Sequence, residues 1–201
     1  LGDVYKRQVI IGSSITITQQ NEYKLIRQFG KVDRVISSSG ISFKIPFIES
    51  TQSLPKETLL YDLAASDVIT KDKKTMISDS YVLWKISDPL KFAQTLNSSV
   101  ESGESRINTA VYNATKNAIS SMSQDQVITS RDGELSDMVM EAIGTNMDQY
   151  GIELLKFETK QLDLPDDNKE AVYERMISER DNIAATYKAE GNSEAKVLSL
   201  I

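Results

Sequence analysis

Hydrophobic residues recur at every second position through much of the first half of the chain, and the clearest example lies in residues 68–89. This segment contains two runs typical of strands, a charged turn between them and an Asp-Pro pair that ends the second run. The second run is apolar on both faces of the predicted strand. Its apolar residues are Val82, Trp84 and Ile86 on one face, and Tyr81 and Leu83 on the other. Such a strand is typical of the centre of a sheet that is covered on both sides.

The turn in this segment, residues 71–74, reads Lys-Asp-Lys-Lys. Asp tolerates turn geometry, and three cations in four residues resist burial. The segment therefore predicts a hairpin in the core of the fold with its tip in solvent. We expect Trp84 to be buried in the sheet rather than to line a ligand pocket.

Residues 22–36 predict an earlier hairpin. Tyr23, Leu25 and Phe29 fall on one face of a period-two pattern, and Gly30 followed by Lys31 is a turn signal. We therefore expect two strands joined at Gly30, with Phe29 on the same strand face as Leu25.

Residues 40–48 alternate most strictly. The alternating apolar residues are Ile41, Phe43, Ile45 and Phe47. Pro46 requires a strand edge or a strand end, because proline has no amide hydrogen to donate. Taken alone, these residues predict an edge strand that faces the core.

The remaining pattern predicts strands, two helices and a final strand. Leu59, Tyr61 and Leu63 alternate once more, and residues 64–67 interrupt the run. After Pro89 the hydrophobic period changes from two to about 3.6, which predicts two amphipathic helices. Their apolar stripes are Ile107, Val111, Ala114, Ala118 and Met122, and then Leu135, Met138, Val139, Ala142, Ile143 and Met147. Gly151 is well placed to cap the second helix, and residues 152–164 return to strand character before Pro165. This order predicts a compact α+β domain.

From Asp166 the composition shifts to Glu, Lys, Arg and Ala, which predicts a long helix. Asp167 with Glu170 matches a capping box, and Pro165 suits a helix start. A heptad repeat places Met176, Ile183, Glu190 and Val197 at one seam position, and Tyr173, Arg180, Tyr187, Glu194 and Ile201 at the other. Charged residues interrupt this seam, and Gly191 costs about 1 kcal/mol relative to Ala. Two interpretations stay open: a single solvated helix, or a coiled coil that needs a partner.

Composition removes several classes of chemistry. None of the 201 residues is Cys or His, which excludes disulfides, thiol nucleophiles, His-based triads and nearly all zinc sites. The net charge is −6 with scattered Lys and Arg, so we expect no nucleic acid partner.

The glycine pattern matches no dinucleotide or phosphate loop. Gly30-Lys31 is followed by Val32 where Ser or Thr is required, and Leu25 stands at the position of the first glycine. We therefore expect no metal, no cofactor and no enzymatic activity. A dyad of Ser39 or Ser42 with Lys44 is formally possible, but such neighbours are common in solvated turns.

The longest aliphatic-rich run, residues 9–18, has ten residues and contains Gly12-Ser13-Ser14. A membrane-spanning helix needs about 20 apolar residues, so we expect no segment of this chain to cross a bilayer unaided. The chain starts at Leu1 rather than Met and ends in mid-pattern, so we expect it to be a fragment. Residues 1–8 show neither strand nor helix pattern, so we expect them to contribute nothing to the fold.

Several separated blocks resemble the band 7 family, also called the SPFH family of stomatin, prohibitin, flotillin and HflK/HflC proteins. The blocks are 28–32 (QFGKV), 40–47 (GISFKIPF), 70–74 (TKDKK), 79–81 (DSY), 84–89 (WKISDP), 150–153 (YGIE) and 163–165 (DLP). They stand in the order of the family's motifs, and the resemblance extends over residues 17–201. It is greatest to the branch that contains HflK and HflC.

The resemblance implies a division of the chain. Residues 1–18 would be a leader and the end of an N-terminal membrane anchor. Residues 19–165 would be the SPFH domain, with antiparallel strands and helices packed on the sheet, and residues 166–201 the start of a C-terminal coiled-coil helix. Compared with the family, the anchor and the long helix are incomplete, and the link at residues 131–133 is short.

The resemblance also implies a function. Proteins of this branch are held in the bacterial inner membrane by one N-terminal helix, with the domain on the non-cytoplasmic (periplasmic or extracellular) face. With an HflK-like paralogue and further copies they form a ring or cage around an FtsH-like ATP-dependent protease and restrain its degradation of membrane proteins. We therefore expect a structural and regulatory role. Two alternatives stay open: a stomatin-like or prohibitin-like scaffold of lipids or channels without a protease, and a membrane-linked serine hydrolase, which is disfavoured.

Candidate site residues follow from the heptad and from the resemblance. We expect the oligomer interface at Tyr173, Met176, Arg180, Ile183 and Tyr187. We expect membrane-proximal residues at Ile10, Ile11, Ile15, Ile17, Phe43 and Phe47. The second set rests on the resemblance, which places the aromatic strand end at the bilayer surface near the anchor. For residues 40–48 this interpretation is an alternative to the edge strand that faces the core.

Overall fold

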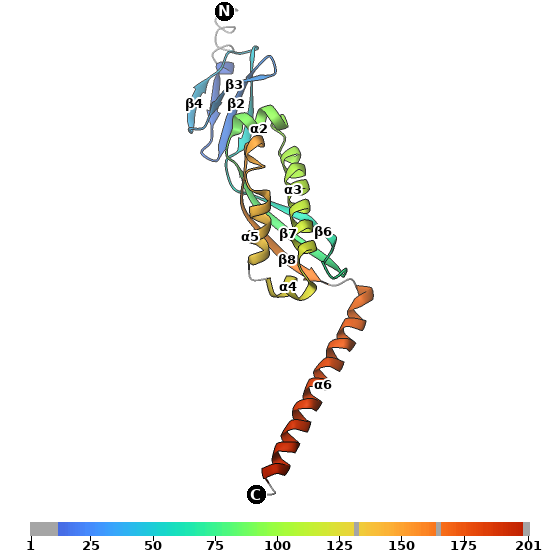
Figure 1. Ribbon diagram of the computed structural model, residues 1–201. Coiled ribbons are helices and arrows are strands. Elements are labelled where there is room, and N and C mark those ends of the chain that lie inside the picture. The colour runs from blue at the N-terminus through green and yellow to red at the C-terminus, as the bar shows by residue number, and fades with distance from the viewer. Residues whose placement is uncertain (1–11, 131–132, 164–165, 199–201) are drawn as a thin grey trace, which may run out of the picture.

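A computed structural model of the chain describes residues 12–130, 133–163 and 166–198 (Figure 1). In chain order the elements are β1 (Ile15–Thr18), β2 (Glu22–Gln28), β3 (Lys31–Ile36), β4 (Gly40–Phe43), β5 (Glu49–Pro55), β6 (Leu59–Ile69), β7 (Thr75–Ile86), α2 (Pro89–Leu96), α3 (Val100–Ser121), α4 (Gln124–Thr129), α5 (Glu134–Ile143), the short 3-10 helix η2 (Asp148–Tyr150), β8 (Ile152–Asp163) and α6 (Asp166–Leu198).

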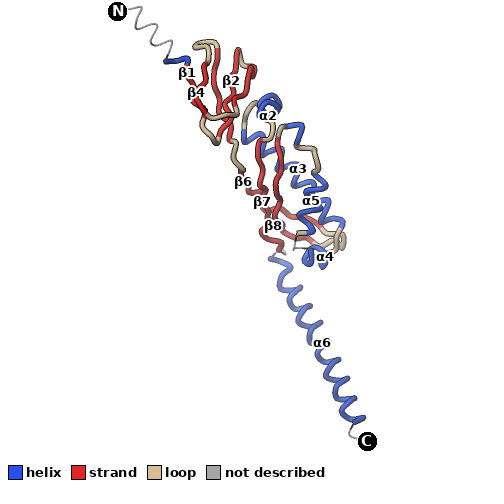
Figure 2. The backbone as a smooth tube through the Cα atoms, turned by 90° about the vertical axis from the view of Figure 1, so that its left-hand side faces the viewer, coloured by secondary structure: helices blue, strands red, loops and turns tan. Residues whose placement is uncertain are grey.

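The described strands form three antiparallel sheets arranged along an elongated molecule (Figures 1 and 2). β1 pairs with β4 in a two-stranded ribbon, β2 lies between β3 and β5, and β7 lies between β6 and β8. The first two sheets lie at the end where the described chain begins. α6 extends from the opposite end (Figure 1). The α+β class with antiparallel sheets and helices is as predicted.

β6 and β7 form the predicted central hairpin, but only one face of β7 is buried. Its residues alternate between buried and half-buried along the whole strand. α3 contacts β6 and α5 contacts β8, so the helices cover the same face of the sheet (Figure 2). Tyr81 and Leu83 are half-exposed on the other face, which also carries the ion pair of Lys85 with Glu153 at 3.1 Å. The prediction of cover on both faces is therefore wrong, because cross-strand ion pairs keep the second face in solvent.

Trp84 is fully buried on the covered face, as predicted. Its ring stacks on Phe92 of α2, with 6.4 Å between the ring centroids and 28° between the planes. Gly103 of α3 lies against the Phe92 ring, and a Cβ atom added there would come within 3.0 Å of Phe92 Cε2. The absent side chain lets α3 approach closely, so one contact joins the sheet, α2 and α3.

The turn after β6 is exposed at residues 71–73, as predicted, and it also docks on the helical layer. The Asp72 carboxylate accepts hydrogen bonds from the Thr70 hydroxyl and from the Gln124 amide (3.2 Å) at the start of α4, and pairs with Lys74 at 3.1 Å. The Thr70 hydroxyl, together with Lys74 and the Gln124 amide, lowers the pKa of Asp72 to about 2. The carboxylate therefore stays ionised at neutral pH and ties the hairpin tip to α4.

The two predicted helical stripes belong to α3 and α5, with Met122 and Met147 beyond the ends of these helices. All residues of the stripes are buried except Met138, which is half-buried, and Ala142, which is exposed. The sequence pattern does not predict α2 and α4, because eight and six residues span too few turns to show a stripe. Asp88, of the Asp-Pro pair, caps α2 by accepting hydrogen bonds from the amides of Leu90 and Lys91.

Two local predictions need correction. Residues 64–67 do not end a strand: β6 continues through them with a bulge between Leu63 and Ser66. Gly151 does not cap α5, which ends before Gly144, and instead follows η2 with a φ of 71°. A Cβ atom at Gly151 would lie 2.2 Å from the Asp88 carbonyl oxygen, so glycine is required where the start of β8 meets the start of α2.

α6 has 33 residues and projects from the domain (Figures 1 and 2). Its side chains are described for residues 173–174 and 176–190, and all of these are exposed. The predicted capping box of Asp167 and Glu170 and the link at residues 131–132 lie outside what is described. Within the described residues, no helix combines the length and the apolar character that crossing a bilayer would require.

Replacing Trp84 by Ala should lower the free energy of unfolding by about 3–5 kcal/mol, the usual cost of deleting a large core aromatic. Leu83→Ala is the matched control on the open face of the same strand, and it should cost clearly less because Leu83 is half-exposed. Urea unfolding of both variants measures the difference. A loss below about 1 kcal/mol for Trp84→Ala would show that this contact does not hold the core together.

Candidate functional site

Large apolar side chains are exposed on the strands and turns that begin the described chain. They are Ile15, Ile17, Phe29, Ile41, Phe43, Ile45, Phe47 and Ile48, and we call this set the apolar end. Phe29 and Phe47 are the most exposed, at 85% and 90%. Soluble proteins seldom gather so many exposed apolar side chains, so the apolar end is the first candidate for a contact surface.

Half of the apolar end lies on the β1–β4 ribbon. Ile15 is opposite Phe43, and Ile17 is opposite Ile41. Residues that are directly opposite, or two apart, share a face of the ribbon, so these four side chains form one apolar face. All four are exposed, at 43–68%. The prediction of an edge strand that faces the core is therefore wrong: residues 41–43 are in a strand, but their apolar face is not covered by the described chain.

The other half lies in two turns, and a buried carboxylate holds the first of them. β4 ends at Phe43, so Ile45 and Phe47 lie in the loop before β5 and not on a strand. Glu49 is 8% exposed, and its Oε2 accepts a hydrogen bond from the Ile45 amide at 2.8 Å. Arg34 donates to the same carboxylate oxygen at 3.3 Å and to the carbonyl of Phe43. Glu49 therefore fixes the loop that presents Phe47.

The second turn joins β2 to β3. Phe29 and Gly30 have φ values of 50° and 83°, as a tight hairpin turn requires. Phe29 thus stands in the turn and not on the strand face with Leu25, which corrects its predicted position. Gln28, the residue before Phe29, is opposite Glu49, the residue after the Phe47 loop, so both turns lie at one end of the sheet.

Two exposed phenylalanines with left-handed backbone therefore lie at the same end of the sheet. Phe47 has a φ of 69°, and Phe29 has one of 50°. A bulky side chain rarely adopts this conformation, and such strain is concentrated at functional sites.

The predicted membrane-proximal residues divide into two groups. Ile15, Ile17, Phe43 and Phe47 all belong to the apolar end, whereas Ile10 and Ile11 lie outside the described residues. The prediction omits Phe29, Ile41, Ile45 and Ile48. The alternation at residues 41–47 was the available signal for Ile41 and Ile45, but alternation alone does not tell an exposed apolar face from a buried one.

The second candidate surface is α6. Its predicted interface residues, Tyr173, Met176, Arg180, Ile183 and Tyr187, are spaced by three and four residues and are all exposed. Their spacing puts them along one side of the helix. Ile177, 61% exposed, lies next to this seam and is absent from the prediction.

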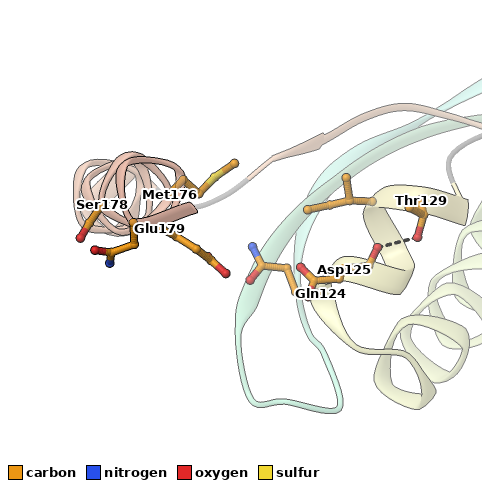
Figure 3. Close-up of a pocket in the computed structure, with 8 residues that line it drawn as sticks. Gln124, Asp125, Thr129, Met176, Ser178 and Glu179 are labelled. Atoms are coloured by element: carbon orange, nitrogen blue, oxygen red, sulfur yellow. Dashed lines mark hydrogen bonds between the residues drawn. The ribbon is translucent and has the colours of Figure 1, made fainter. Parts of the chain in front are cut away.

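An open groove of about 800 Å³ separates the start of α6 from α4. Met176 and Glu179 of α6 and Gln124 and Asp125 of α4 line this groove, and Figure 3 shows Glu179 pointing across it toward Gln124. The start of α6 is thus separated from the domain by this groove. The apolar residues of α6 are therefore available for contact with another helix.

In the part of the chain that the structure describes, no three Asp or Glu side chains gather to hold a metal ion. Lys44 makes no described side-chain hydrogen bond with Ser39 or Ser42, the two serines of the possible dyad.

Comparison with known proteins gives one family and several relatives. The profile of the SPFH domain / Band 7 family matches residues 16–193. "Protein HflC" of Haemophilus influenzae is 29% identical over 92% of this chain and 66% of its own length. "Modulator of FtsH protease HflC" of Escherichia coli is 25% identical over 94% of this chain and 71% of its own length. An uncharacterized protein of Methanothermobacter thermautotrophicus is also 25% identical, over 94% of this chain and 58% of its own length. The chain thus spans about two thirds of the length of the HflC relatives.

Replacing Glu49 by Ala should free the loop that carries Phe47. The Ile45 amide would lose a hydrogen bond to a charged acceptor, which contributes roughly 1.5–3 kcal/mol, so its hydrogen exchange should rise by roughly ten- to a hundred-fold. The amide of Leu25 in the middle of β2 is the internal control and should not change. Equal acceleration of both amides would show that the substitution loosens the whole sheet and that Glu49 does not act on the loop.

Proposed function

This chain belongs to the SPFH domain / Band 7 family, and on that premise we propose that it is an HflC-like, membrane-anchored scaffold subunit. It assembles with further copies and an HflK-like paralogue into a ring or cage and regulates an FtsH-like protease. The observation that carries the proposal is the apolar end. Its aromatic and aliphatic side chains are exposed at the end of the molecule where the chain enters the domain.

A membrane surface is the partner that best suits the apolar end. Its exposed residues are aliphatic or Phe, and they project from a ribbon and two turns rather than lining a pocket. Surfaces of this kind bury their apolar side chains in the boundary between lipid headgroups and acyl chains. On this proposal residues 1–18 hold the end of the anchor, residues 19–165 are the SPFH domain, and the domain lies on the non-cytoplasmic face of the bacterial inner membrane.

Assembly is assigned to α6 as the start of a coiled coil in residues 166–201. The exposed seam of Tyr173, Met176, Ile183 and Tyr187 supports this, and Arg180 and Glu190 within it favour selective pairing over strong pairing. Anchors in one bilayer hold neighbouring domains at high effective concentration, which compensates for a weak seam. α6 and the apolar end lie at opposite ends of the molecule, so one chain engages both the membrane and its neighbours (Figure 1).

The protease partner is proposed from the relatives. The Escherichia coli relative is named as a modulator of FtsH protease. Purification of the anchored protein from its own membrane in mild detergent, with identification of the co-purified proteins, tests this part. An FtsH-like protease and an HflK-like paralogue are expected.

A second candidate is a stomatin-like or prohibitin-like scaffold without a protease. It is supported by the family match over residues 16–193, because that match is to the SPFH domain / Band 7 family as a whole and not to HflC in particular. Recovery of large assemblies and lipids without any protease in the same purification would support this candidate and reject the first.

Replacing both Phe29 and Phe47 by Asn should weaken membrane binding without loss of stability. Asn tolerates left-handed backbone better than Phe, so the melting temperature should stay the same or rise. Each Phe contributes roughly 1.5 kcal/mol or more when buried in an apolar medium, so loss of both should lower vesicle partitioning of the chain by about a hundred-fold. The control is Tyr112→Asn on α3, where a partly exposed aromatic lies outside the apolar end. Unchanged partitioning of the double variant would remove the apolar end from the membrane contact.

Replacing both Ile183 and Tyr187 by Asp should disperse the large assemblies of the anchored protein without unfolding the domain, because it places charge in the α6 seam. Ser178→Asp with Ala185→Asp adds the same charge on the opposite side of α6 and should leave the assemblies intact. Without a complete anchor, the chain should be mostly monomeric at micromolar concentration. Sedimentation in mild detergent distinguishes these states, and large assemblies that survive the first double variant would show that α6 is not the assembly surface.

A further inference from the structure

A pocket beside the apolar end has the composition of an anion site. Its volume is about 390 Å³, and it lies between the β2–β3 hairpin and α2. Residues that line it include Arg27, Lys31, Val32, Ala93, Gln94 and Asn97. Two of these are cationic, and none of the lining residues is acidic.

Arg27 carries a charge that the described chain does not neutralise with a carboxylate. One guanidinium nitrogen donates to the Ser98 hydroxyl at 2.7 Å, and the other to the Asn97 side-chain oxygen at 3.5 Å. Both acceptors are neutral. The third nitrogen, Nε, is buried and has no described hydrogen-bond partner. A half-buried cation with neutral partners retains capacity for an anion, because charge-assisted bonds to phosphate are about twice as strong as neutral ones.

A structural role also accounts for part of this geometry. Asn97 and Ser98 follow the last residue of α2, and a cation near a helix C-terminus is stabilised by the helix dipole. That role requires neither the pocket nor Lys31, which lines it and has no described partner.

The depth of the pocket relative to the apolar end suits a lipid headgroup. Arg27 is on β2, two residues before Phe29 in the turn, so it is set back from Phe29 by at most about 7 Å, the rise of two extended residues. The headgroup layer on one side of a bilayer is about 5–8 Å thick. If Phe29 enters the edge of the acyl region, Arg27 lies at the level of the phosphates.

We propose that this pocket binds the phosphate of an anionic phospholipid through Arg27, with Lys31 as the second cation. The inference rests on the proposed membrane contact and adds a lipid preference to it: the apolar end supplies attachment to any bilayer, and the pocket selects anionic headgroups.

The test compares partitioning of the full chain into vesicles of phosphatidylcholine alone and of equal parts phosphatidylcholine and phosphatidylglycerol. Arg27→Gln removes the charge, and Gln94→Glu supplies a carboxylate beside it at an exposed position of α2. Each should lower partitioning into the anionic vesicles by about five-fold, the effect of one cation near a charged surface, and leave partitioning into phosphatidylcholine unchanged.

Matched controls separate the pocket from net charge. Lys116→Gln and Asn117→Asp make the same charge changes at exposed positions of α3 and should have clearly smaller effects, because charges more than about 10 Å from the surface are screened. Thermal unfolding of every variant excludes loss of fold. If Arg27→Gln lowers anionic binding no more than Lys116→Gln does, the headgroup site is wrong.

Three outcomes distinguish the inference from the function on which it rests. Loss of the anionic preference in the pocket variants, with attachment to phosphatidylcholine retained, supports both proposals. Attachment by the unmodified chain with no anionic preference rejects the pocket alone, and no attachment to either vesicle rejects the membrane contact and the lipid site together.

Inorganic phosphate is the last probe. If it shifts the Gly30 and Ala93 amide resonances with a Kd below about 1 mM while the chain shows no preference for anionic vesicles, the pocket binds a free anion and not a lipid.

Discussion

The stack of Trp84 on Phe92 is the contact on which the rest of the structure depends. Trp84 comes from the central strand β7, and Phe92 comes from the short helix α2, so the contact fixes α2 against the sheet. Gly103 lets α3 close over the same ring, and Gly151 lets the start of β8 pass the start of α2. Each of these positions tolerates little change, because its neighbours are already in van der Waals contact.

This core also places the apolar end. The C-terminus of α2 meets β2 through the hydrogen bonds of Arg27 to Asn97 and Ser98, so the N-terminal sheet is held by the helix that the aromatic stack positions. Because β1 to β5 are antiparallel, the chain returns repeatedly to the same end of these sheets. Three separate segments present apolar residues there: the ribbon, the Phe29 turn and the Phe47 loop. The buried carboxylate of Glu49 fixes the last of these.

The sequence predicts elements whose apolar residues recur over many positions. The central hairpin, the stripes of α3 and α5, the strand β8 and the long helix α6 are recovered because each repeats its pattern over ten or more residues. Periodicity reports that one face is apolar, and it does not report what covers that face. For this reason β7 was predicted to be covered on both sides, and the strand at Ile41 and Phe43 to face the core. Phe29 was misplaced because a turn residue interrupts the period, and contacts such as that of Gly151 with Asp88 join segments distant in sequence.

The central claim is that the apolar end lies in the bilayer surface, and the absence of Cys from the chain allows a direct measurement. A single nitroxide label can be placed at position 47, at position 29, or at position 117 on α3, and its collisions with oxygen and with a water-soluble nickel chelate measured in the membrane-bound protein. Labels at 47 and 29 should collide mainly with oxygen, as probes in lipid do, and the label at 117 mainly with the chelate. Equal exposure of all three positions to the chelate would contradict the account.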